Sequence, residues 1–187
     1  MKKWVVAVFI LIISASAAYS QGKTIGIHAG AGTDITLGLA VGGGASYLLT
    51  DLVGFDMEVG AFLFYSYSVD SYTEYGNHYT ETTSMFIFAV LSNFLFNYQG
   101  AEPGIFFIAG AGAAAMSVDW QIQSPDDSSA NFTWDGVTGG LLVNIGLGGT
   151  FGGGFELRLQ APIFIVFTDY GGVKFAPMLV LLAGYRF

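Results

Sequence analysis

The chain ends in a strongly alternating stretch, residues 179–187, in which every second residue is apolar. Successive side chains of a β-strand point to opposite faces, so this stretch predicts a strand with two unlike faces. One face is apolar and closes on an aromatic residue: Leu179, Leu181, Ala183, Tyr185 and Phe187. It carries no charge and is suited to lie against lipid, whereas Gly184 and Arg186 point the other way.

The N-terminal residues have the three parts of a secretory signal peptide. Lys2 and Lys3 precede the apolar run 4–13, and a small-residue stretch, 14–20, follows it. That run is too short for a membrane-spanning helix, which needs about 20 apolar residues. We therefore expect a cleavable leader at residues 1–20, with the cut after Ala18 or Ser20, and a single domain at residues 21–187.

The composition is apolar for a chain without a long hydrophobic helix. Hydrophobic residues make up 53% of the sequence and charged residues 11%, whereas a soluble domain averages about 25% charged. Besides the helix, a closed β-barrel is the structure that satisfies every backbone polar group in lipid. The 27 glycines suit a narrow lumen, and the 17 Phe and 10 Tyr suit aromatic girdles at the membrane interfaces.

Alternation recurs along the chain and predicts eight strands with short and long connections in turn. Approximate strands are 24–32, 35–49, 55–69, 83–96, 105–120, 139–150, 155–167 and 175–187. The long connections are predicted as loops at 70–81, 121–138 and 169–174, and the link at 32–34 is tight. On the strands whose alternation is readable, no charge falls on the lipid face, where it would cost about 2–4 kcal/mol at the midplane. Strands four and five are apolar on both faces, so their registers stay open; a soluble β-sandwich is the alternative fold.

The mature chain resembles the small outer-membrane β-barrels of the OmpA transmembrane domain and OmpX type. The resemblance rests on the eight-strand architecture and on the aromatic ending at Tyr185 and Phe187, which is similar to the C-terminal signature read by the barrel-assembly machinery of diderm bacteria. It implies an all-β, transmembrane, eight-stranded, antiparallel up-and-down barrel in the cell outer membrane. Its implied partners are outer-membrane lipid and that machinery, and we expect a monomer.

Five charged residues are predicted to meet inside the barrel. Asp56 and Glu58 on the third strand and Glu156 and Arg158 on the seventh share inward parity, as does Arg186 on the eighth. The third and seventh strands are opposite each other in an eight-stranded ring. Because a buried charge needs a partner, we expect a lumenal charge network that is either structural or gating.

Further inward residues become apolar toward the other end of the lumen: Phe62, Phe64, Phe164, Val166, Met178 and Val180. They indicate either dry packing or a pocket for an acyl chain. The lumen of eight strands is barely wide enough for side chains, which argues against free diffusion.

The predicted outer loops are acidic and aromatic. The acids are Asp70, Glu74, Glu81, Asp119, Asp126, Asp127, Asp135 and Asp169, with Lys174 as the nearby base, and the aromatic residues are Tyr72, Tyr75, Tyr79, Phe132, Trp134 and Tyr170. They indicate interface girdles or an adhesive surface toward an unidentified extracellular ligand. The formal net charge of −8 makes nucleic acid a poor partner.

Catalytic and cofactor motifs are weak. The stretch 110–115 fits a dinucleotide-binding pattern, but no helix follows it. His78 lies near Ser71, Glu74, Glu81 and Ser84, the ingredients of a lipid hydrolase. The absence of cysteine excludes a thiolate metal site. We expect a non-enzymatic protein without metal or cofactor, with a structural or surface-interaction role. A narrow channel or carrier for small or hydrophobic solutes and an outer-leaflet lipid-modifying enzyme are the alternatives.

Overall fold

The computed structural model describes residues 25–34, 38–52, 55–100, 102–126, 129, 131–167 and 173–187. Within them the chain forms eight strands: β1 (Ile25–Asp34), β2 (Leu39–Leu52), β3 (Phe55–Glu74), β4 (Asn77–Phe96), β5 (Gly104–Gln123), β6 (Phe132–Thr150), β7 (Phe155–Phe167) and β8 (Val173–Arg186). No helix in this part of the chain is long and apolar enough to cross a membrane. The predicted leader and its cleavage site lie outside the described residues.

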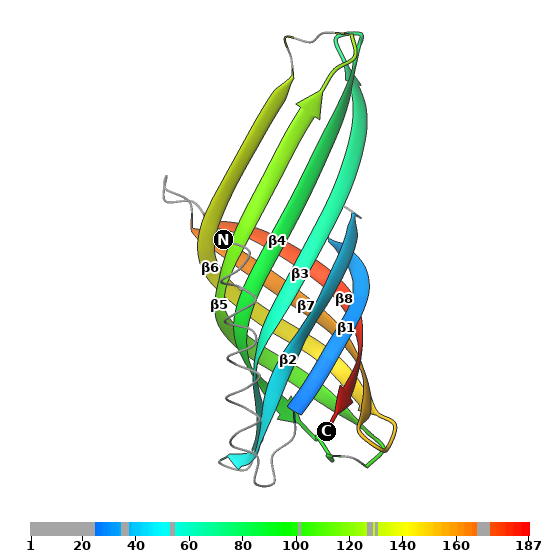
Figure 1. The fold of residues 1–187 in the computed structure, drawn as a ribbon, viewed down its shortest axis with the longest axis vertical. Helices are drawn as coiled ribbons and strands as arrows, with labels where there is room; N and C mark the ends of the chain where they lie inside the picture. Colours follow the sequence, from blue (N-terminus) through cyan, green and yellow to red (C-terminus); the bar gives the residue numbers. More distant parts are fainter. Residues whose placement is uncertain are drawn as a thin grey trace.

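The strands form one closed antiparallel ring in chain order, and β1 pairs with β8 to complete it. The predicted all-β, eight-stranded, up-and-down barrel is therefore confirmed. Figure 1 shows that β1 begins at the end of the barrel where the chain terminates. We call this the terminal end, and the opposite end the hairpin end.

The alternation expected from the sequence is confirmed on the strands where it was readable. On β8, Leu179, Leu181 and Tyr185 are exposed on the outside, while Val180 and Leu182 are fully buried. The structure also sets the registers of β4 and β5, which the sequence left open. Their inward side chains include Leu91 on β4 and Ile108 on β5. The outer wall of the ring is thus an apolar surface suited to lipid.

Two of the predicted loops are wrong. Residues 70–81 lie almost wholly within β3 and β4, which pair without interruption from Asp56 opposite Leu95 to Glu74 opposite Asn77. The turn consists of Tyr75 and Gly76, both at positive φ, which is the backbone of a tight two-residue hairpin. Most of residues 121–138 likewise extend β5 and β6, which pair as far as Ile122 opposite Phe132. Acidic residues interrupt the aromatic residues on one face of these strands, so the sequence shows no uniformly apolar face that would indicate a strand.

The long hairpins give the barrel unequal walls. Strands β3 to β6 rise well beyond β1, β2, β7 and β8 at the hairpin end (Figure 1). Pairing of β2 with β3 stops at Leu39 opposite Tyr67, and pairing of β6 with β7 stops at Gly140 opposite Val166. Beyond these points a four-stranded sheet continues alone. We call the described residues within 68–83 and 118–136 the extension.

The remaining connections are short. The short connection between the predicted strands 83–96 and 105–120 is confirmed, since β4 ends at Phe96 and β5 begins at Gly104. The short connection before the predicted strand 155–167 is confirmed too, with Gly152, Gly153 and Gly154 at positive φ. The link predicted at 32–34 is wrong, because these residues belong to β1, which ends at Asp34, while β2 begins at Leu39. The Gly38 N–H donates to Asp34 Oδ1 at 2.9 Å. Residues 35–37 of the predicted second strand and most of the predicted loop 169–174 lie outside the described residues.

Candidate functional site

Four of the five predicted lumenal charges meet inside the barrel. Arg158 donates to both oxygens of Glu58, with Nη1 to Oε1 and Nη2 to Oε2 each at 2.9 Å. It also donates to Glu156 Oε2, from Nε at 2.9 Å and from Nη2 at 2.7 Å. Arg186 links the same two acids, from Nη2 to Glu58 Oε2 at 2.7 Å and from Nε to Glu156 Oε1 at 2.8 Å. Two carboxylates and two guanidinium groups therefore form a closed, charge-balanced set.

Asp56 is at the margin of this set. It lies one inward position nearer the terminal end than Glu58 on β3, and it is half-buried, whereas Glu58, Glu156 and Arg158 are fully buried. Of the two acids predicted to face Arg158, Glu58 is the one that pairs with it. The difference follows from depth, because only the deeper carboxylate reaches the middle of the lumen.

Uncharged side chains complete the hydrogen bonding of the two acids. Ser46 Oγ and Asn93 Nδ2 donate to Glu58 at 2.9 and 3.1 Å. His28 Nε2 lies 3.0 Å from Glu156 Oε2, and the Tyr98 hydroxyl donates to Glu156 Oε1 at 2.8 Å. Together they form what we call the polar layer: His28, Ser46, Glu58, Asn93, Tyr98, Glu156, Arg158 and Arg186. All four carboxylate oxygens of Glu58 and Glu156 are hydrogen-bonded, whereas His28 Nδ1 and Arg186 Nη1 have no hydrogen-bond partner among the described residues. A buried network with its acids satisfied in this way suits a rigid plug.

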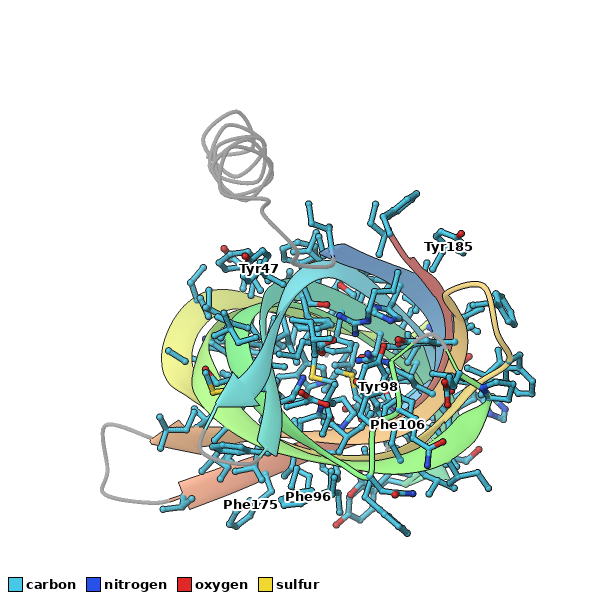
Figure 2. The ribbon with its side chains drawn as sticks, turned by 90° about the horizontal axis from the view of Figure 1, so that it is seen from below. Tyr47, Phe96, Tyr98, Phe106, Phe175 and Tyr185 are labelled. Carbon is cyan, nitrogen blue, oxygen red and sulfur yellow. The ribbon has the colours of Figure 1, made fainter. Side chains whose placement is uncertain are left out.

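Sequence reasoning missed most of these uncharged partners as members of the layer. Inward parity does mark His28 and Ser46, and a comparison of strand heights could have placed them beside the acids. Asn93 lies on β4, whose register the sequence left open. Tyr98 carries no such signal, because it belongs to the β4–β5 turn. Asn97 adopts a positive φ of 63° in this turn, and the Tyr98 ring then lies inside the ring of strands beside Phe106 (Figure 2). The two rings meet edge to face at 5.1 Å.

Glycine makes room for the bulky members of the lumen. A Cβ on Gly184 would lie 2.0 Å from His28 Cδ2, so the imidazole packs directly against the β8 backbone. A Cβ on Gly148 would lie 2.2 Å from the Phe106 ring. Real side chains do not approach so closely, so glycine is required for both neighbours to keep their places.

Apolar packing closes the lumen on both sides of the polar layer. Toward the hairpin end lies one buried cluster that includes all six predicted apolar residues: Phe62, Phe64, Phe164, Val166, Met178 and Val180. Toward the terminal end, Leu48, Leu95, Phe106 and Ile108 form a second cluster, with Tyr98 packed against it. The predicted dry packing is confirmed for these residues. A hollow of about 510 Å³ lies instead over Gly43 on the β1–β4 wall, bordered by outward side chains such as Ile27 and Leu63.

The extension gathers aromatic and acidic side chains on a single face. Cross-strand partners lie on the same face of a sheet. The pairing of β3 to β6 is continuous and has no bulge, so side chains that point into the barrel lower down are followed by side chains on the same face in the extension. This inner face carries Asp70, Tyr72 and Glu74 from β3, Tyr79 and Glu81 from β4, Trp120 and Ile122 from β5, and Phe132 and Trp134 from β6. The opposite face is richer in Ser, Thr and Gln and carries Asp119 and Asp135.

Contacts hold the aromatic residues of the inner face in place. Tyr72 and Tyr79 are stacked with ring centroids 5.3 Å apart, and Trp120 meets Phe132 edge-on at 5.4 Å. Trp120 Nε1 donates to Glu81 Oε1 at 2.7 Å. The pKa of the Tyr72 hydroxyl is raised by desolvation and by the nearby Glu81 and Glu74 carboxylates, which agrees with their place on one negative face.

The hydrolase constellation is not assembled. His78 Nδ1 lies 3.0 Å from Thr73 Oγ1, and the His78 backbone N–H donates to Asp126 Oδ2 at 2.9 Å. Ser71 is paired with Thr80, two positions along the strand from His78, so His78 is not hydrogen-bonded to a serine nucleophile. The stretch 110–115 lies within β5 and is not followed by a helix, so it does not form a dinucleotide-binding turn. Among the described residues, no group of three or more His, Cys, Asp or Glu could hold a metal ion.

The two residues of the predicted assembly signal lie on the outer surface. Tyr185 and Phe187 are 45% and 68% exposed, and their rings meet edge-on at 4.9 Å. The Phe187 N–H donates to the carbonyl oxygen of Ile25 at 2.9 Å, which joins the end of the chain to the start of β1. The terminal aromatic residue therefore belongs to the seam where the ring closes.

Solved structures of bacterial membrane barrels have the same arrangement. A major outer membrane protein from Thermus thermophilus is 13% identical with a TM-score of 0.57, over 89% of this chain and 100% of that one. Neisserial surface protein A is 14% identical with a TM-score of 0.53, over 89% and 96%. The N-terminal β-barrel domain of Pseudomonas aeruginosa OprF is 21% identical with a TM-score of 0.50, over 88% and 97%. The chain has the fold of the small outer-membrane barrels. This is the OmpA and OmpX type of architecture, although no family model and no curated protein sequence matches the chain.

Proposed function

We propose that this outer-membrane barrel is a closed, non-enzymatic scaffold that presents the extension for contacts outside the cell. The observation that carries the proposal is the contrast between a filled lumen and a tall acidic, aromatic sheet at the hairpin end. In this orientation both ends of the chain face the periplasm and the extension faces outward, since outer-membrane barrels have short periplasmic turns and longer outer connections.

The polar layer serves, in this proposal, to lock the barrel rather than to conduct. Each acid is paired with both arginines at 2.7–2.9 Å, and apolar clusters lie on both sides of the layer. An ion crossing the lumen would have to lose its hydration shell at each of the two apolar clusters, and this desolvation is costly in a low-dielectric interior. Conductance of the refolded protein in a planar bilayer tests this role. We expect no resolved channel openings, and steady openings would favour the narrow channel instead.

The extension supplies the surface. Phe132 is 46% and Trp134 is 48% exposed on its inner face, and large apolar groups left open to water are typical of contact sites. A trimmed variant tests this part of the proposal. Two-residue Asn-Gly turns would join Ser68 to Thr83 and Val118 to Gly136, which are cross-strand partners, so the barrel below keeps its register.

Proteoliposomes carrying the intact or trimmed barrel are then exposed to three immobilised coatings: a cationic peptide, a neutral glycan and an anionic polysaccharide. We expect retention of the intact barrel on at least one coating and loss of that retention on trimming. Equal retention of both forms on all three would contradict a surface role for the extension. The heat-dependent gel shift of folded barrels shows whether the trimmed chain still folds.

We further propose that Tyr185 and Phe187 act as an assembly signal for the barrel-assembly machinery. Support comes from their exposure at the seam between β8 and β1, where the two ends of the sheet are joined. Deleting Phe187 should lower the amount of folded barrel in the membrane severalfold. Replacing Tyr75 by Asn, which gives an Asn-Gly turn with Gly76, should not lower it. Unchanged amounts after loss of Phe187 would remove the support for a signal.

A further inference from the structure

We propose that the inner face of the extension binds a cationic peptide segment, with Asp70 and Glu81 pairing with its basic side chains and Tyr72 and Trp134 stacking on them. This inference rests on the proposed function and names the chemistry of the partner. It is carried by the charge of the face, by the exposure of its aromatic rings and by the repulsion within its carboxylate pair, Asp70 and Glu81, in the free protein.

The charge of this face is unbalanced. Asp70 and Glu81 are direct cross-strand partners, and Glu74 is two inner-face positions beyond Asp70. Of the six Lys and Arg residues, Lys2, Lys3 and Lys23 precede β1, and Arg158 and Arg186 are in the lumen. Among the described residues, Lys174 at the start of β8 is the one Lys or Arg outside the lumen, and β8 is not a strand of the extension.

The carboxylate pair of the inner face is unfavourable where it stands. Like charges directly opposite each other in an antiparallel sheet destabilise it. In the polar layer each carboxylate has two guanidinium partners, but Asp70 and Glu81 face each other across β3 and β4. A bound guanidinium or ammonium group would relieve this repulsion, so cation binding gains energy here that it would not gain on a balanced surface.

The aromatic rings distinguish this face from a merely acidic one. Tyr72 is 39% exposed and Trp134 is 48% exposed, and the Trp134 ring lies over Gly136, where a Cβ would come within 2.6 Å of it. Flat, open aromatic faces attract Arg and Lys through the ring quadrupole. At the base of the same face lies Ser66, which is 1% exposed and whose hydroxyl has no hydrogen-bond partner among the described residues.

The extension supplies a matched control on its other face. Asp119 and Asp135 are also direct cross-strand partners, on β5 and β6, and they lie on the face richer in Ser, Thr and Gln. Neutralising either pair removes the same charge from the same sheet. The pairs differ in the face they occupy and in the rings around them, so a difference in binding reports the site and not the net charge.

The test uses the full-length barrel refolded in lipid nanodiscs and a labelled seven-residue peptide carrying three arginines, followed by fluorescence anisotropy. Its citrulline counterpart and maltoheptaose are the comparison probes. We expect the arginine peptide to bind, the citrulline peptide to bind at least about fivefold more weakly, and the variant D70N/E81Q to lose about fivefold or more in affinity. The variant D119N/D135N should change affinity by less than about twofold, and Trp134→Ala should weaken binding where Val137→Ala on the other face does not.

Equal losses from both carboxylate pairs would overturn the proposal, because they would indicate general attraction to an acidic surface. Binding of maltoheptaose without binding of the arginine peptide would also overturn it, and would leave the surface role of the extension standing with a neutral glycan as partner. If no coating retains the barrel through the extension in the trimming experiment, the surface role itself fails. Gln at position 81 keeps an acceptor for Trp120 Nε1, so a lost fold is not the expected outcome, and the gel shift checks it.

Discussion

The polar layer and the extension both contain carboxylates, but the carboxylates have opposite effects on stability in the two regions. In the polar layer, Glu58 and Glu156 are fully buried, and both arginines donate to each of them. In the extension, Asp70 lies opposite Glu81 and Asp119 lies opposite Asp135, with no Lys or Arg on the same strands. Carboxylates that stabilise one region therefore repel each other in the other.

Burial explains the difference. A charge inside the barrel has no water to solvate it, so it is tolerated only with partners of opposite sign and enough hydrogen bonds. A charge on the extension keeps its water and costs little alone. Charges in the lumen must therefore be paired with opposite charges of the same chain, whereas the extension can carry charges that pair with another molecule.

The largest expected effect follows from removing a cation of the polar layer. Arg158→Met leaves Glu58 and Glu156 buried with Arg186 as the remaining guanidinium partner of the two. Breaking one side of a buried ion pair costs about 3–5 kcal/mol. We expect a clear fall in the urea midpoint, measured by the gel shift of the folded barrel, and a higher conductance if the layer also seals the lumen.

The double variant Arg158→Met with Glu58→Gln is the control for this prediction. It removes one charge of each sign, so it should recover part of the lost stability. A midpoint unchanged by Arg158→Met alone would mean that the polar layer contributes no more to stability than the exposed acids do, and the comparison would fail.

A smaller effect is expected from crowding the polar layer without changing its charge. Gly184→Ala places a Cβ where the His28 ring now lies, so the ring must move from Glu156. Overpacking of this kind costs about 1–3 kcal/mol. Gly139→Ala is the matched control, because nothing lies within 4 Å of its new methyl group. Equal urea midpoints for the two variants would show that the lumen is loosely packed.

The smallest effect has the opposite sign. Asp135→Asn removes one member of the exposed pair with Asp119, and relief of a cross-strand repulsion should raise stability by about 0.2–1 kcal/mol. The gain should shrink as salt is raised from about 50 mM to 500 mM, because exposed charges are screened. Glu58→Gln in the polar layer should lower stability at both salt concentrations. A loss of stability in Asp135→Asn would indicate that this carboxylate has a partner within the chain.

Several features of the fold follow from local patterning. The lipid face of β8 and the inward Glu156 and Arg158 on β7 could be predicted. Side chains of a strand alternate between its two faces, so the position of every side chain is fixed once one face must be apolar. The ends of β3 to β6 could not be predicted in this way. Both faces of the extension meet water, and acids such as Asp70 and Glu81 interrupt the aromatic residues of its inner face, so neither face is uniformly apolar. The strands persist through backbone pairing and a two-residue turn at Tyr75 and Gly76.

On every strand except β4 and β5, the sequence by itself determined which side chains face lipid and which face the lumen, since that choice depends on parity along a single strand. Which lumenal groups touch was decided by the tertiary structure, because contact across a barrel depends on the stagger of all eight strands. This is why Glu58 and not Asp56 pairs with Arg158, and why Tyr98 from a turn completes the shell of Glu156. The inner face of the extension depends likewise on four strands in register, a property that no one segment carries.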